Sequence, residues 1–217
     1  MSEKSPERKK DMKKFRRLLL SLAGILSLVS CSSPRQAVDN EPEEPTMGAS
    51  NVLVAYFSWS GNTRQVSKWV SEETGGELFR ILTKEAYPED YSSVADRAQE
   101  ELRNKTRPEL ETHIEKETMV HYDTLFVGFP IWWYDLPMPV WSFLEEYDLK
   151  DKTIIPFFTH NGSSSGAGAI STLKEIVKDA NVIDSPLSIR GSSVEGSKDA
   201  VSKWIDSLPI EFKKSGE

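Results

Sequence analysis

From residue 51 onward, short apolar runs alternate with amphipathic segments. Continuous apolar runs are typical of strands buried on both faces, and they occur at residues 51–57, 77–82, 124–130 and 152–160. The segments that follow them space their apolar residues as one face of a helix does, at residues 63–76, 88–103, 139–148 and 168–180. A weaker pattern comes last: residues 181–191 indicate a broken fifth strand and residues 195–209 a closing helix.

This order of elements predicts an α/β fold. Right-handed crossovers place helices on both faces of a parallel sheet, which gives a doubly wound, five-stranded, three-layer architecture. Ligands of such sheets bind beyond the carboxyl ends of the strands. Three unusual loops follow strands here, "SWSGNT" at 58–63, "PIWWYDLPMP" at 130–139 and "THNGSSSG" at 159–166. We therefore expect them to converge on one site.

The first loop has the composition of a phosphate site. Gly61 permits a tight turn, and Asn62 and Thr63 lie where a helix begins with unpaired N–H groups and a positive dipole end. A phosphate there would also accept bonds from the hydroxyls of Ser58, Ser60 and Thr63. Simple N-capping is the alternative, since these residue types are favoured caps. The loop has no lysine, which excludes the nucleoside-triphosphate motif GxxxxGK[ST].

The second and third loops could hold a flat ring. Consecutive aromatic residues such as Trp132 and Trp133 cannot all point into one core, so one of them either stacks on a ligand or caps the core. The third loop offers backbone N–H groups that could bond the edge of a ring carrying carbonyl and imide groups. His160 is either a proton donor or a structural residue.

Together these loops resemble those of the flavodoxin-like family, particularly its small bacterial subgroup with "YFSxSGNT" near the start. The likeness includes "AYPEDYSSVADRAQEEL", "RPEL", "VGFPIWW" and "IIPFFTHNGSSSG", each at its expected place. The resemblance implies strand order 2-1-3-4-5 and non-covalent binding of FMN.

The resemblance also implies a role for each loop residue. The phosphate would be held by Ser58, Ser60, Gly61, Asn62 and Thr63. One side of the isoalloxazine would be lined by Pro130, Ile131, Trp132 and Trp133. The other side would be lined by Thr159, His160, Asn161, Gly162 and Ser163. Trp59 belongs to the candidate cofactor-binding residues as well, although the sequence assigns it no role.

Other functions fit the motifs less well. Residues 162–166 satisfy GxSxG, the serine hydrolase elbow, but all three histidines precede Ser164, so the base that should follow the nucleophile is missing. "GAGAIS" lacks the third glycine of a dinucleotide site. Scattered histidines and one cysteine predict no metal site, and no catalytic residue is assigned. A non-redox lipoprotein that binds another ligand in the same pocket remains an alternative.

The charge is unevenly distributed. The chain has a net charge of −7, but residues 1–30 carry eight Lys and Arg against three Asp and Glu, which leaves −12 for the rest. An acidic body argues against nucleic acid binding, which depends on cations that neutralise phosphates. It suits basic partners. Hydrophobic residues make up 38% of the chain, enough for a full core.

The N-terminus predicts export. Basic residues precede an apolar run from Leu18 to Val29, the layout of a secretory signal. "LVSC" resembles the lipobox of bacterial lipoproteins, which implies lipidation of Cys31, the single cysteine. We predict a signal peptide over 1–31, starting at Met1 or Met12, an acidic proline-containing tether over 32–49, and an FMN-binding domain over 50–212.

The expected protein is thus a membrane-anchored lipoprotein of the bacterial cell envelope. We expect FMN to exchange electrons with an unidentified envelope partner or with a small acceptor such as a quinone, because the cofactor carries the chemistry. Whether the protein is an electron carrier or an enzyme with its own substrate stays open.

Overall fold

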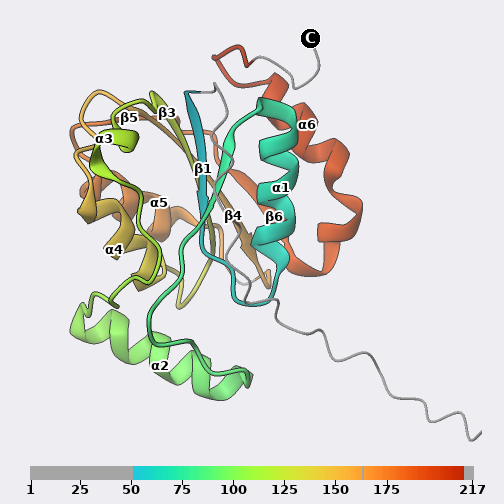
Figure 1. Cartoon of the computed structure of the whole chain (residues 1–217). Helices are drawn as coiled ribbons and strands as arrows, with labels where there is room; N and C mark the ends of the chain where they lie inside the picture. Colours follow the sequence, from blue (N-terminus) through green and yellow to red (C-terminus); the bar gives the residue numbers. More distant parts are fainter. Residues whose placement is uncertain (1–50, 163, 213–217) are drawn as a thin grey trace, which may run out of the picture. The chain divides into compact units, whose positions relative to one another are not determined.

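The computed structural model describes residues 51–162 and 164–212 (Figure 1). The strands are β1 (Val52–Tyr56), β2 (Glu77–Arg80), β3 (Thr124–Pro130), β4 (Thr153–His160), β5 (Asn181–Val182) and β6 (Leu187–Arg190). The helices are α1 (Asn62–Thr74), α2 (Tyr91–Asn104), α3 (Lys116–Met119), α4 (Met138–Glu146), α5 (Ala167–Ile176), the 3₁₀ helix η1 (Gly191–Gly196) and α6 (Lys198–Asp206). The predictions for residues 1–49, including Cys31, lie outside the described part.

The sheet is parallel, and its order is β2-β1-β3-β4-β5. Its fifth position is occupied by two short segments: β5 pairs with the start of β4, at Thr153 and Ile154, and β6 pairs with its end, from Phe157 to His160. The predicted strand order and the predicted break in the fifth strand are therefore both confirmed.

Two hydrophobic clusters cover the two faces of the sheet. On one face, Leu53 and Leu125 pack with residues of α4 and α5, among them Phe143 and Leu173. On the other face, side chains of α1 and α6 pack against the sheet, as Trp204 does against Phe126. Strand residues alternate between the two clusters because successive side chains point to opposite faces. This is the predicted three-layer arrangement.

Helix α2 differs from the other long helices because it lies beyond the end of β1 and not on a face of the sheet (Figure 1). The Asp90 carboxylate caps it by accepting a bond from the Ser93 N–H at 2.9 Å. Hydrogen bonds from Ser93 and from the Ser92 hydroxyl lower the pKa of Asp90 to about 2. Val94 and Ala98 are buried, but Tyr91, which the helical pattern places on the same face, is 69% exposed. The carboxyl end of the sheet thus has a helix beside it.

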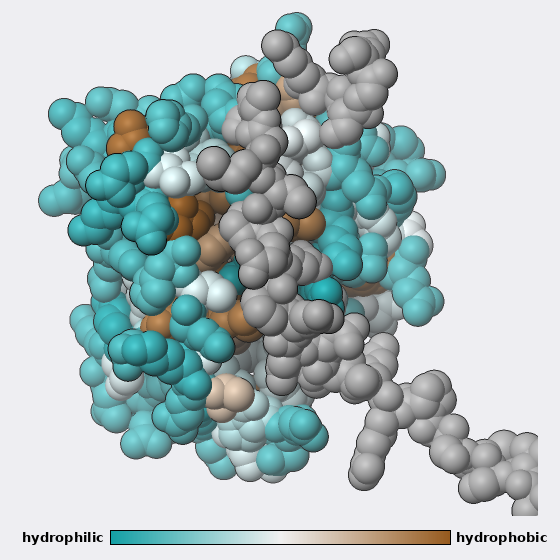
Figure 2. Space-filling view, in the orientation of Figure 1, coloured by the Kyte–Doolittle hydropathy of each residue, from teal (hydrophilic) through white to brown (hydrophobic). Residues whose placement is uncertain are grey.

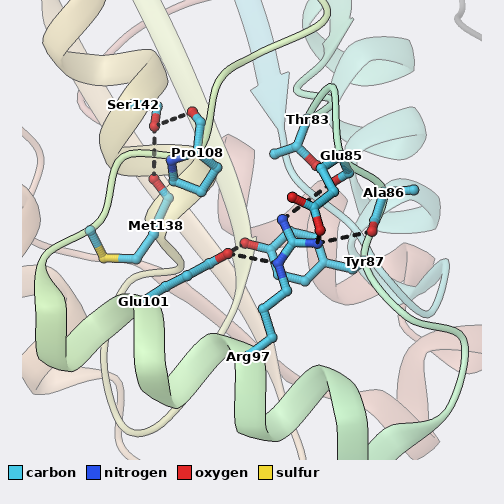
Figure 3. Close-up of polar contacts among 9 residues, drawn as sticks. All are labelled: Thr83, Glu85, Ala86, Tyr87, Arg97, Glu101, Pro108, Met138 and Ser142. Carbon is cyan, nitrogen blue, oxygen red and sulfur yellow. Dashed lines mark hydrogen bonds and ion pairs between the residues drawn. The ribbon is translucent and has the colours of Figure 1, made fainter.

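A partly buried polar cluster attaches α2 to the connection that precedes it (Figure 3). The Arg97 Nε donates to Glu101 at 2.8 Å, and its other nitrogens donate to the carbonyls of Ala86 and Glu85. The Tyr87 hydroxyl donates to Glu101, and the Arg97 guanidinium lies 4.1 Å from the centre of the Tyr87 ring. Burial and the bond to Glu101 raise the pKa of Tyr87.

Most of the surface visible in Figure 2 is hydrophilic, and hydrophobic residues form small separate areas on it. Among the helices of the described residues, none has both the length and the apolar character needed to cross a bilayer.

Candidate functional site

The turn into α1 has an uncapped helix start. Gly61 occupies the N-cap position with φ 88°, and this residue makes no side-chain cap bond. The left-handed backbone explains the glycine, because other residues adopt it at a cost. The N-capping alternative for this loop is therefore wrong, because the N-cap residue is a glycine.

Ser58 contributes a buried hydroxyl to this turn. The residue is 7% exposed, and its Oγ has no hydrogen-bond partner among the described residues. A buried hydroxyl without a partner is costly, so the Ser58 hydroxyl is available to bond a ligand at this turn. Thr63 is buried as well, and its hydroxyl lies 2.9 Å from that of Thr159. Ser60 and Gly61 are exposed.

The second loop forms a tight turn. The N–H and carbonyl of Trp132 bond the carbonyl and N–H of Asp135, at 3.1 and 2.9 Å. The two central residues, Trp133 and Tyr134, have φ values of 48° and 66°. Turns of this kind normally use Asn and Gly, and each such residue costs about 1–3 kcal/mol. Backbone outliers of this size cluster at functional sites, where the surroundings hold them.

The aromatic residues of this turn divide between core and surface. Trp132 packs edge-on against Phe57 and Tyr87, with ring centres 5.2 and 5.1 Å away, so it caps the core. Trp133 is 44% exposed, and its indole N–H donates to the Ala95 carbonyl of α2 at 2.8 Å. Tyr134 is 62% exposed. The core-capping alternative thus describes Trp132, while the two following rings are available to a ligand.

Trp59 acquires a role that the sequence did not indicate. Its indole N–H donates to the Pro88 carbonyl at 2.8 Å, and its ring centre lies 6.4 Å from that of Tyr91. Together with the bond from Trp133 to Ala95, this connects the first and second loops to residues 88–95. Indole groups on two sides therefore attach the start of α2 to the loops.

A cavity of about 240 Å³ lies between α2 and the loops. Its lining combines aromatic and small apolar side chains, namely Trp59, Tyr91, Val94, Ala95, Ala98, Ile131, Trp132, Trp133, Tyr134 and Ser164. Largely apolar cavities with a few polar groups at the edge are typical ligand sites. The volume and the aromatic lining suit one flat ring.

The third loop is ordered by contacts with β6. The Gly162 N–H donates to His160 Nδ1 at 2.8 Å, which makes His160 a structural acceptor through that nitrogen. Gly162 has φ 97°, and a β-carbon there would come within 2.2 Å of the Arg190 guanidinium. Arg190 also donates to the Asn161 carbonyl at 3.4 Å. Sequence reasoning missed Arg190, since the fifth strand had no distinctive loop motif. Ser163 lies outside the described residues.

The three loops meet at the carboxyl edge of the sheet. Thr63 contacts Thr159, and the Ile131 N–H donates to the Thr159 carbonyl at 2.8 Å. Pro130, the last residue of β3, pairs with Thr159 in β4. The Asn62 and Asn161 side chains both approach Gly191. Sequence reasoning missed the residues of α2 that line the cavity, because an amphipathic pattern does not say what the helix packs against.

Ser164 of the GxSxG motif stabilises the turn before α5. Its hydroxyl accepts a bond from the Gly166 N–H at 3.0 Å, directly before α5. This contact accounts for a serine at that position without hydrolase chemistry.

Comparison with known proteins agrees with the fold. A family model described as flavodoxin matches residues 51–208. No curated protein matches the chain. Because the family model covers most of the chain, the protein belongs to the flavodoxin family, as the resemblance of its loops predicted.

Several solved structures are similar. A flavoprotein candidate from Bacteroides uniformis ATCC 8492 is 33% identical, with 72% of this chain and 97% of that chain covered and a TM-score of 0.62. A second candidate, from Bacteroides eggerthii DSM 20697, is 30% identical, with coverage of 74% and 98% and a TM-score of 0.62. A flavoprotein from Lactobacillus acidophilus NCFM, solved in complex with FMN, is 24% identical, with coverage of 67% and 96% and a TM-score of 0.53.

Proposed function

We propose that this protein binds FMN non-covalently and exchanges electrons through it. One observation carries the proposal: the buried hydroxyl of Ser58 has no partner among the described residues and lies in the loop that leads to the uncapped start of α1. A phosphate accepts bonds from hydroxyls and from helix N-terminal N–H groups, so it would satisfy both. Membership of the flavodoxin family and the FMN complex of the L. acidophilus relative support the same cofactor.

The loops would divide the cofactor between them. The phosphate would be held by Ser58, Ser60, Gly61, Asn62 and Thr63. The ring would lie in the cavity beside α2, with Ile131, Trp132 and Trp133 on one side. The third loop, residues 159–163, would bond the edge of the ring.

When bound, FMN supplies one- and two-electron chemistry, and the protein controls access and potential. The residues of this chain would bind the phosphate, orient the ring and limit water around it. Acidic surroundings would disfavour an anionic reduced ring, as like charges do for any ionisation. The net charge of −12 on residues 31–217 therefore favours a low potential.

The electron partner would be an envelope protein or a small acceptor such as a quinone. The secretory layout of the N-terminus and the lipobox cysteine Cys31 support a lipoprotein anchored to a membrane of the bacterial envelope. Incorporation of labelled palmitate in the producing cells tests this, with Cys31→Ser as the control that should carry no label.

Titration of flavin-free protein with FMN tests the phosphate assignment. We expect Ser58→Ala to weaken FMN binding by about tenfold, because a hydrogen bond to a charged group contributes about 1.5–3 kcal/mol. Ser71→Ala is the matched control, since that hydroxyl donates to the Gly76 carbonyl at the opposite end of α1. If Ser58→Ala and the wild type bound FMN with equal affinity, the assignment of the phosphate to this loop would be wrong. A wild type that binds no FMN would favour the non-redox alternative.

A further inference from the structure

The carbonyl of Tyr134 lies directly against the first turn of α5. A β-carbon built on Gly168 would come within 2.7 Å of the Tyr134 oxygen, a separation that real β-carbons essentially never show. The nearby atom is backbone, so it cannot swing aside as the end of a flexible side chain can. Any residue other than glycine at 168 therefore requires the turn or the helix to move.

The turn that supplies this carbonyl is the strained one. Trp133 and Tyr134 both have positive φ, which bulky aromatic residues rarely adopt. Such a conformation persists only where its surroundings determine it. The Asp135 carboxylate fixes one end by accepting a bond from the Leu136 N–H at 2.7 Å, and the indole of Trp133 bonds α2. The approach to Gly168 fixes the middle of the turn.

We propose that Gly168 is a positioning residue for the ring cavity. It touches none of the cavity directly, but it permits the Tyr134 carbonyl to lie on α5, and that placement sets the direction of the Trp133 and Tyr134 side chains along the cavity wall. The claim that Gly168 positions the turn rests only on its approach to the Tyr134 carbonyl. Its consequence for FMN rests on the proposed function.

The experiment compares Gly168→Ala with Gly196→Ala. Gly196 is the matched control because, among the described residues, nothing lies within 4 Å of a β-carbon placed there. Two readouts are used: the indole N–H resonance of Trp133 in flavin-free protein, assigned with Trp133→Phe, and the dissociation constant for FMN. We expect Gly168→Ala to shift the resonance and to raise the dissociation constant about tenfold, equivalent to about 1.4 kcal/mol. Gly196→Ala should change neither.

The readouts separate this proposal from the proposed function. If the wild type binds no FMN, the cofactor assignment fails, and the indole resonance still decides whether Gly168 positions the turn. An unshifted resonance in folded Gly168→Ala overturns the positioning role. Should Gly168→Ala not fold, the variant Gly168→Ala/Tyr134→Gly, whose turn can rotate away at little cost, must fold, and its failure would equally overturn the proposal.

Discussion

The hydroxyl of Thr63 lies 2.9 Å from the hydroxyl of Thr159, although 96 positions separate the two residues in the chain. Both side chains are buried, at 1% and 3% exposure. Thr63 belongs to the first turn of α1 and Thr159 to the end of β4, so this contact joins the phosphate loop to the third loop. Since neither hydroxyl can turn to water, the two depend on each other.

Loss of one hydroxyl of this pair should cost stability. Thr63→Val keeps the shape of the side chain but leaves the Thr159 hydroxyl buried without this partner, so we expect the free energy of unfolding to fall by about 1–3 kcal/mol. In the variant with valine at both positions the second loss should be smaller than the first. Urea unfolding of the flavin-free proteins measures this, and fully additive losses would contradict the coupling.

Ser58 should show opposite effects with and without cofactor. Because its hydroxyl is buried and unpartnered among the described residues, Ser58→Ala should unfold at the same temperature as the flavin-free wild type or higher. Saturating FMN stabilises whichever protein it binds, by an amount set by affinity. The variant should therefore gain less from FMN than the wild type does. A melting temperature well below wild type without flavin would mean that the hydroxyl has a partner inside the protein.

The Arg97 cluster should hold α2 in place (Figure 3). Arg97→Met leaves the Glu101 carboxylate, whose side chain is 9% exposed, without its cation. Because the pair is only partly buried and Glu101 keeps its bond from Tyr87, we expect a loss of about 1–3 kcal/mol of stability. We expect faster hydrogen exchange in α2 as well, because Arg97 bonds this helix to the carbonyls of Glu85 and Ala86. Arg103→Met, on the exposed side of the same helix, should change stability by less than about 0.5 kcal/mol. Equal effects of the two substitutions would show that the Arg97 cluster does not hold α2 in place.

The fold should lose stability above pH 10. Burial raises the pKa of Tyr147 to about 12, and burial also raises the pKa of Tyr87 and Tyr122. Unfolded tyrosines ionise near pH 10. Between about pH 10 and pH 12 the unfolded chain therefore binds fewer protons than the native state, and stability falls as pH rises.

Tyr147→Phe tests the sign of this effect. The hydroxyl accepts a bond from the Ile114 N–H at 2.8 Å, so the variant loses stability at neutral pH. Its further loss between pH 10 and pH 12 should nevertheless be smaller than in the wild type. A steeper loss in the variant would show that Tyr147 is not among the groups that titrate on unfolding.

The sequence predicted the sheet well because its strands are buried on both faces. Val54 and Ile155 lie in continuous apolar runs that few other structures produce. The break in the fifth strand was also visible, because "DSP" interrupts its apolar pattern. The loops could be placed at one edge of the sheet by topology alone.

The features of the site that the sequence did not predict depend on contacts between residues far apart in the chain. Nothing in the pattern of Val94 and Ala98 says that α2 lies beside the loops rather than on the sheet. The role of Trp59 depends on the Pro88 carbonyl, 29 positions away. The positive φ of Tyr134 runs against the preference of its residue type, so local propensity could not predict the turn. The missing partner of Ser58 is a property of the folded molecule only.

The central claim is that a phosphate-bearing flavin occupies this edge of the sheet. The most direct test is to titrate the flavin-free protein with FMN and with riboflavin, which has the same ring but no phosphate, and to compare the dissociation constants. We predict that FMN binds at least about a hundredfold more tightly, equivalent to about 2.8 kcal/mol. Equal affinity for the two flavins, or no binding of either, would contradict it.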